Sequence, residues 1–209
     1  MKKQRNGLST ILFYGAIWGI IEATLGYVLH LVPTFIAGLI MFPIASFILV
    51  RVYRVLGSRS SILYVGLVAA AIKSVDFFLP ELSVFKTLNP MVSIIVEAMI
   101  VMVVYPYLVN TKSLVSGIGA VMASLGWRAV FVLYMYIQFI MTGNLAQFLA
   151  TPADGVSFVV ISGTLSACLL FGAVWLESKK RLLVGNVFNL KPVIVGSTLL
   201  VALIVTYVM

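Results

Sequence analysis

The stretch Ser9–Leu31, STILFYGAIWGIIEATLGYVLHL, decides the fold class of this chain. Glu22 is its only acidic residue, and most of the others are apolar. A helix of this length rises roughly 35 Å, which is enough to cross a hydrocarbon core about 30 Å thick. The stretch has no small-residue cleavage site, so we expect a retained helix rather than a signal peptide.

Further apolar runs of similar length follow along the chain. Of all residues, 62% are hydrophobic and only 10% are charged, and the mean hydropathy is +1.16. Only helices or closed barrels satisfy their backbone in lipid, and these runs are too long and uniform for barrel strands. We therefore predict an all-α, polytopic membrane helical bundle, with a six-helix core plus a seventh, C-terminal transmembrane helix. The predicted spans are 9–31, 34–55, 61–80, 90–109, 114–142, 152–176 and 190–208. Residues 1–209 then form a single integral membrane domain.

Basic residues predict the orientation of the bundle. With a cytoplasmic N-terminus, nearly all of them fall on the cytoplasmic side, and Lys86 alone falls on the other. By the positive-inside rule we expect a multi-pass protein of the cell membrane, with a cytoplasmic N-terminus and an extracytoplasmic C-terminus. The net charge of +8 is dispersed over short loops, so we expect the lipid bilayer and no nucleic acid as a partner.

Five ionisable side chains interrupt the apolar runs, and each costs roughly 3 kcal/mol to insert at the centre of a bilayer. At 1.5 Å per residue, all five lie near one plane in the outer half of the membrane. They are Glu22, Lys73, Asp76, Glu97 and Arg128. We predict that they form one substrate-binding cluster, with Trp18 and Trp127 beside it to stack on a ligand.

A structural role is the alternative for part of this cluster. Lys73 and Asp76, spaced i and i+3, can pair with each other, and Glu22 or Glu97 can pair with Arg128. Three acids against two bases still leave one negative charge unmatched. Either an acid is protonated or a cation completes the site, which favours a cationic or zwitterionic organic solute such as a nitrogen heterocycle.

Three other features bear on the expected architecture. Asn89 is the predicted N-cap of a helix that begins at Pro90. The uncharged segment 143–151 is expected to form a short lid at the outer surface. Pro43 predicts a kink, and hence a hinge, in the second span.

No motif in the sequence indicates catalysis or a metal. A nucleophile elbow, a His–Glu zinc pattern and a phosphate-binding loop are all missing from it. His30 and Cys168 are the only residues of their kinds, which gives no metal-ligand spacing. We therefore predict no catalytic residues, no metal and no cofactor, and no ATPase activity in the chain itself.

The run GAIWGIIEA places small residues one helical turn apart, at Gly15, Gly19 and Ala23. In this stripe, in its size and in its basic N-terminus, the chain resembles the substrate-binding S components of energy-coupling factor (ECF) transporters. The resemblance covers 8–180 and implies capture of a vitamin or micronutrient in the outer half. It also implies docking of the stripe on a transmembrane coupling subunit that works with ATPase subunits. The helix in 188–209 is extra to the six-helix core of that family.

Two function classes follow. The favoured one is a membrane-embedded solute-binding subunit of an uptake transporter, which captures a small organic solute from the outer side. The alternative is an intramembrane enzyme acting on a lipid or prenyl substrate, with Glu22 or Glu97 as acid or base. A small stand-alone carrier or channel is a third reading.

Overall fold

The computed structural model describes the backbone of residues 2–29, 34–80, 82–180 and 190–209, and the side chains of 7–29, 36–80, 82–178 and 190–209. Within these ranges every regular element is helical. The α-helices are α1 (Lys2–Ile21), α2 (Tyr27–Leu29), α3 (Thr34–Leu56), α4 (Ser60–Lys73), α5 (Val84–Leu108), α6 (Ser113–Thr142), α7 (Pro152–Val156), α8 (Ser162–Lys180) and α9 (Pro192–Val208). Four short segments have other helical geometries, namely η1 (Glu22–Gly26), η2 (Ser74–Phe78), η3 (Gln147–Leu149) and η4 (Ser157–Ile161).

The predicted fold class is confirmed. In the described part of the chain, six helical segments are long and apolar enough to cross a membrane. Three of them are composite, because α1 continues through η1 into α2, α4 continues into η2, and α7 continues through η4 into α8. The seventh helix, α9, is apolar but shorter, with 17 residues.

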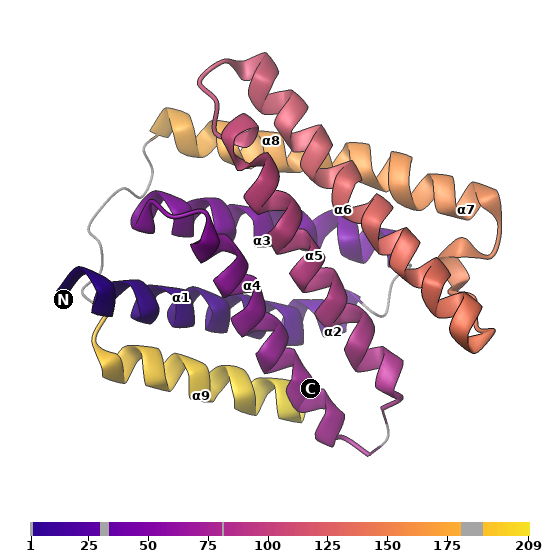
Figure 1. The fold of residues 1–209 in the computed structure, drawn as a ribbon, viewed down its shortest axis with the longest axis horizontal. Helices are drawn as coiled ribbons and strands as arrows, with labels where there is room; N and C mark the ends of the chain where they lie inside the picture. The colour runs from indigo at the N-terminus through magenta and orange to yellow at the C-terminus, as the bar shows by residue number, and fades with distance from the viewer. Residues whose placement is uncertain (1, 30–33, 81, 181–189) are drawn as a thin grey trace.

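The helices form two layers (Figure 1). In front, α4, α5 and α6 cross the molecule obliquely, with α5 packed between its two neighbours. Behind them, α1, α3, α8 and α9 run side by side, and α9 packs along α1. Contacts of α1 with α4 and of α6 with α8 join the two layers.

Glycines allow the closest helix approaches in the core. A Cβ atom built on Gly119 of α6 would lie 2.6 Å from the backbone nitrogen of Leu108, at the end of α5. One built on Gly66 of α4 would lie 2.5 Å from the Cβ of Ala98 in α5. Neither position has room for a side chain, so these glycines fix how α4, α5 and α6 pack.

Ion pairs hold one end of the bundle together. Near the end of α3, Arg54 Nη1 lies 2.9 Å from Glu177 Oε2 of α8, and Arg51 Nη1 lies 3.8 Å from the other carboxylate oxygen. The rings of Tyr53 and Tyr105 lie in tilted contact beside this cluster, with centroids 3.9 Å apart. Glu177 is buried. Sequence reasoning missed its role, although an acidic residue at the same depth as two arginines is the signal that predicts an ion pair.

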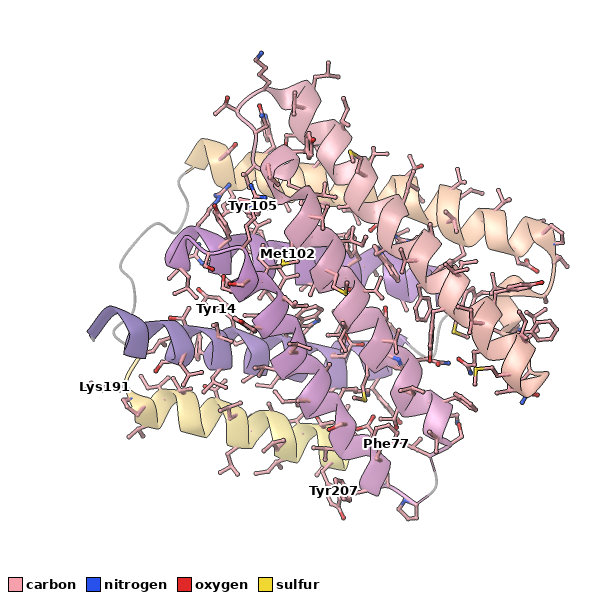
Figure 2. The ribbon with its side chains drawn as sticks, in the orientation of Figure 1. Tyr14, Phe77, Met102, Tyr105, Lys191 and Tyr207 are labelled. Atoms are coloured by element: carbon pink, nitrogen blue, oxygen red, sulfur yellow. The ribbon has the colours of Figure 1, made fainter. Side chains whose placement is uncertain are left out.

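Successive helices alternate in direction, so the two ends of the bundle differ. The end of α3 and the beginnings of α4, α6 and α9 share one end, which carries Arg51, Arg54, Arg59, Lys112 and Lys191. Figure 2 shows Lys191 at the beginning of α9, while Phe77 and Tyr207 lie together at the far end of α9, where it meets η2. The bundle therefore has a basic end and an opposite end, here called the η2 end.

The predicted beginning of the fourth span is wrong. α5 begins at Val84, six residues before Pro90, and its N-cap is Ser83 rather than Asn89. Proline removes only one hydrogen-bond donor, and the preceding residues supply enough turns for the helix to form ahead of it. Asn89 is instead a side-chain partner of α6, since its Oδ1 accepts a hydrogen bond of 2.9 Å from the Tyr134 hydroxyl.

Pro43 lies inside α3, as predicted from its position in the second span. Its missing N–H leaves the carbonyl of Leu39 without the usual helical donor. The hinge at this position stays a prediction.

Candidate functional site

A cavity of about 610 Å³ opens at the η2 end of the bundle. Residues from η1, the first turns of α3, η2, α5, α6, η3, η4 and the end of α9 line it. Its volume falls within the range of about 300–1,000 Å³ that is typical of small-molecule sites. Each of the six long apolar segments contributes a lining residue, so the bundle holds a space here rather than a packed core.

Four of the lining segments depart from α-helical geometry. Glu22–Gly26 and Ser157–Ile161 are π-helical turns, and Ser74–Phe78 and Gln147–Leu149 are 3₁₀ turns. In the first of them, the Thr24 hydroxyl donates a hydrogen bond of 2.7 Å to the carbonyl of Ile20, which satisfies a backbone acceptor next to the widened turn. Such turns occur often at functional sites, where they aim particular side chains.

Four of the five predicted ionisable residues line the cavity, namely Glu22, Lys73, Asp76 and Glu97. The predicted pair of Lys73 with Asp76 is confirmed, since Lys73 Nζ lies 2.8 Å from Asp76 Oδ2. Both side chains are largely buried, with 16% and 7% of their surface exposed. The two charges therefore neutralise each other at the cavity wall.

Glu22 and Glu97 are the remaining carboxyl groups of the cavity. Ser93 Oγ donates a hydrogen bond of 3.1 Å to Glu97 Oε1, one turn away on α5. Among the described side chains, neither glutamate forms an ion pair. Lys86, an exposed residue of α5, also lines the cavity. With three carboxylates against two ammonium groups, the fully ionised lining carries a net charge of −1.

Arg128 stands behind the cavity wall rather than in it. Its Nη1 donates to the carbonyl and the hydroxyl of Ser124 at 2.8 and 2.9 Å, and its Nη2 donates to the Gly38 carbonyl at 2.9 Å and the Ser162 hydroxyl at 3.2 Å. Its guanidinium carbon lies 4.7 Å from the centre of the Trp127 ring. The side chain is fully buried and joins α6 to α3 and α8. The predicted pairing with Glu22 or Glu97 is not among the described ion pairs.

Aromatic side chains form another part of the cavity lining. Trp127 and Phe131 come from α6, Phe148 from η3 and Phe158 from η4, and all four line the cavity. Phe148 lies 4.6 Å from Phe158 and 6.3 Å from Phe131 between ring centroids, while Trp127 lies 6.0 Å from both Phe131 and Phe158. We call Trp127, Phe131, Phe148 and Phe158 the aromatic wall. Because Phe148 belongs to 143–151, that segment contributes to the lining of the cavity, and its role as a lid stays a prediction.

Sequence reasoning identified only Trp127 of this wall. The phenylalanines are single members of apolar runs, and nothing in their spacing separates a cavity-facing ring from a lipid-facing one. Phe148 offered the one available signal, because it is the aromatic residue of an uncharged outer loop.

Trp18, the other predicted stacking residue, is not among the lining residues. It is buried in the core, 1% exposed. Its ring lies beside Gly66, since a Cβ atom built on that glycine would lie 3.6 Å from Trp18 Cζ3. His30 lies outside the described residues.

The small-residue stripe packs within the chain. A Cβ atom on Gly15 would lie 2.5 Å from Val68 Cγ1, and one on Gly19 would lie 3.0 Å from Ile72 Cδ1, both in α4. Ala23 is buried and lines the cavity. These residues therefore have an intrachain role, and docking of a partner through them stays a prediction.

Within the described ranges, no group of three or more His, Cys, Asp or Glu side chains is placed to hold a metal ion. Comparisons with protein-family models, with curated proteins and with solved structures give no significant match to this chain.

Proposed function

We propose that this chain is a membrane-embedded solute-binding subunit of an uptake system, which captures a small organic solute in the cavity at the η2 end. The observation that carries the proposal is the mixed lining of this cavity. Charged groups from η1, α4, η2 and α5 and aromatic rings from α6, η3 and η4 together line a space of about 610 Å³. A cavity that is mostly apolar, with a few convergent polar groups, is the usual form of a small-molecule site.

The energetic cost of the charged residues supports a functional role. A bundle held together only by packing gains nothing from carboxyl groups at membrane depth, where each costs roughly 3 kcal/mol. Asp76 is compensated by Lys73 at 2.8 Å, but Glu22 and Glu97 have no such ion pair among the described residues. Side chains of this kind inside a membrane usually mark a substrate or ion path.

The position of the cavity supports capture from outside. The cavity lies at the η2 end, opposite the basic end that carries Arg51, Arg54 and Arg59. If the basic end is cytoplasmic, as the positive-inside rule predicts, the cavity lies in the outer half of the membrane. If the uptake is driven by ATP, a coupling subunit with ATPase subunits supplies that activity, because the sequence of this chain has no phosphate-binding loop.

The test is to look for a small molecule that co-purifies with the chain. We would purify the protein in lipid nanodiscs and examine it by native mass spectrometry, with denaturing extraction to identify released molecules. We expect a stoichiometric organic adduct on the unmodified chain. Ala37→Phe should abolish it, because Ala37 lines the cavity and a phenyl ring there fills it.

The matched control is Gly172→Phe, which adds the same bulk where nothing lies within 4 Å of a built Cβ. This variant should keep the adduct. An adduct that survives Ala37→Phe would show that the cavity is not the binding site. A lipid or prenyl product found in place of a captured solute would favour the intramembrane enzyme.

A further inference from the structure

The cavity has two chemically different halves, and this restricts what it can bind. Resting on the proposed function, we infer that the solute is an organic cation with a flat ring. Its cationic group binds at Glu22 and Glu97, and its ring binds at the aromatic wall. The charges of the lining, its aromatic rings and the position of Arg128 determine the sign, the kind and the orientation of this ligand.

The sign of the charge on the ligand follows from the charged side chains that line the cavity. Asp76 and Lys73 form a pair at 2.8 Å, and Lys86 is exposed. Glu22 and Glu97 are therefore the carboxyl groups in the cavity that lack an ion pair among the described residues. A cationic ligand compensates them, whereas an anion adds to the repulsion in a medium of low dielectric constant.

The other side chains of the cavity indicate an organic cation rather than a metal ion. A bare metal ion prefers several oxygen or nitrogen ligands, and no cluster of three or more such acidic, His or Cys side chains occurs in the described part of the chain. A cavity of about 610 Å³ with four aromatic side chains in its lining is also far larger than such an ion needs. The rings match a ligand that carries a flat apolar surface, since offset and edge contacts between rings each add about 0.5–1.5 kcal/mol.

The orientation of the ligand in the cavity follows from the position of Arg128. Its guanidinium lies 4.7 Å from the centre of the Trp127 ring and 5.8 Å from that of Phe158. This fixed positive charge stands behind the aromatic wall, so it repels a second cation there and occupies the site where a cation would bind the Trp127 ring. The cationic group of the ligand is therefore placed at Glu22 and Glu97 rather than at the ring of Trp127.

Four small probes separate the contributions of charge and ring. Tryptamine has an ammonium group and an indole, tryptophol has the indole with a neutral hydroxyl, indole-3-propionate has the indole with a carboxylate, and hexylamine has an ammonium group without a ring. Binding would be measured at pH 7 by isothermal titration to the protein in nanodiscs, with empty nanodiscs subtracted. We expect tryptamine to bind at least about tenfold more tightly than each of the other three, which corresponds to about 1.4 kcal/mol or more.

Variants then assign each contribution to its wall. Glu97→Gln and Glu22→Gln should reduce the advantage of tryptamine over tryptophol several-fold, because each removes a negative charge from the cation site. Phe148→Leu should weaken tryptamine and tryptophol to the same extent and leave hexylamine unchanged. Asp154→Asn is the control for loss of a carboxylate, since Asp154 is exposed, is not a lining residue and belongs to the capping box of α7.

These experiments separate a failure of this inference from a failure of the proposed function. Equal or tighter binding of tryptophol or indole-3-propionate, or no measurable binding of tryptamine, overturns the assignment of a cationic ring compound. In that case a stoichiometric adduct that Ala37→Phe abolishes would still support solute capture. If tryptamine binds Ala37→Phe as well as it binds the unmodified chain, the cavity is not the site, and both proposals fail.

Discussion

Arg128 shows how a single residue can be placed at the right depth and still have an unexpected role. Its four hydrogen bonds go to backbone and hydroxyl oxygens of Ser124, Gly38 and Ser162, so a buried charge joins three helices without a carboxylate. Its planar fork suits several acceptors in fixed directions, which lysine cannot reproduce. The residue acts on the cavity through the position of Trp127 and through its charge.

The ion pair of Lys73 and Asp76 leads to the first prediction. Lys73→Met and Asp76→Asn should each lower the free energy of unfolding by about 1–3 kcal/mol, because each leaves a buried charge without its partner. The double variant should be more stable than the sum of the two losses predicts, with a coupling energy of about 0.5–3 kcal/mol. Thermal unfolding in detergent, followed by tryptophan fluorescence, measures all three.

The control for this cycle is the pair Lys86→Met and Asp154→Asn, in which both side chains are exposed and no ion pair joins them among the described residues. Their effects should add. Strict additivity for Lys73 and Asp76 would mean that the 2.8 Å contact contributes nothing to stability.

At the residue scale, the sequence predicted which polar groups gather, but not how each is used. Depth along a helix follows directly from residue number, so Glu22, Lys73, Asp76 and Glu97 were correctly expected to come together. The partners of Arg128 include the carbonyl of Gly38, and a backbone acceptor leaves no trace in the sequence. The same reason explains why the aromatic wall was missed.

Helix contacts lead to the second prediction, which concerns α5 and α6. Gly119→Ala should destabilise the protein by about 1–3 kcal/mol, because the new Cβ meets the backbone of Leu108 and Tyr107, which cannot move aside as a side chain can. Gly172→Ala should be neutral or stabilise by up to about 1 kcal/mol, since nothing lies within 4 Å and alanine is the better helix former. Thermal unfolding midpoints of the two variants test this. Equal midpoints would contradict the close approach.

The third prediction concerns the small-residue stripe in α1. Gly15→Leu should lower the unfolding midpoint, because its side chain would displace Val68 of α4, where even a Cβ lies 2.5 Å from Cγ1. Gly7→Leu is the matched control, with no neighbour within 4 Å. A Gly15→Leu protein that keeps full stability but loses uptake in cells would favour the predicted docking role over intrachain packing.

The sequence predicted that each helix exists, but it did not predict the irregular turns within the helices. Long apolar runs leave no alternative to helices in lipid, so every predicted span has a helical counterpart. The beginning of α5 was misplaced because proline often begins a helix, and its tolerance six residues inside depends on the packing of its neighbours. The π-helical and 3₁₀ turns at the cavity depend on side-chain contacts across the bundle, which a single sequence does not display.

The orientation of the whole molecule is the subject of the fourth prediction. In a Cys168→Ser background, a cysteine at Asn144 should react with an impermeant maleimide added to intact cells. A cysteine at Ser58 should react only after permeabilisation. Both positions are exposed and lie in connections at opposite ends of the bundle, and the basic end is expected inside. The reversed pattern would place the cavity on the cytoplasmic side and exclude capture from outside.

For the whole bundle, composition determined the class of protein, and the distribution of basic residues predicted its orientation in the membrane. Which helix completes the cavity could be seen only in the structure. α9 packs along α1 and contacts η1 and η2, and its Thr206 lines the cavity. The sequence marked this helix only as an extra span. Its place beside Glu22 depends on shape, since Ala202 is fully buried in a small cluster with Ala16 and Ile72.

The π-helical turn at Glu22–Gly26 makes the first span sensitive to length rather than to composition. Such a turn encloses one residue more than an α-helical turn, so deleting Leu25 would let the helix become regular with the parts before and after it still in phase. Inserting a residue after Leu25 would instead rotate these parts against each other by about 100°, the angle between successive residues of an α-helix. Either Gly26 and Tyr27 then leave the cavity lining or Gly15 and Gly19 leave α4. An insertion in this apolar stretch would therefore be more damaging than a deletion at the turn.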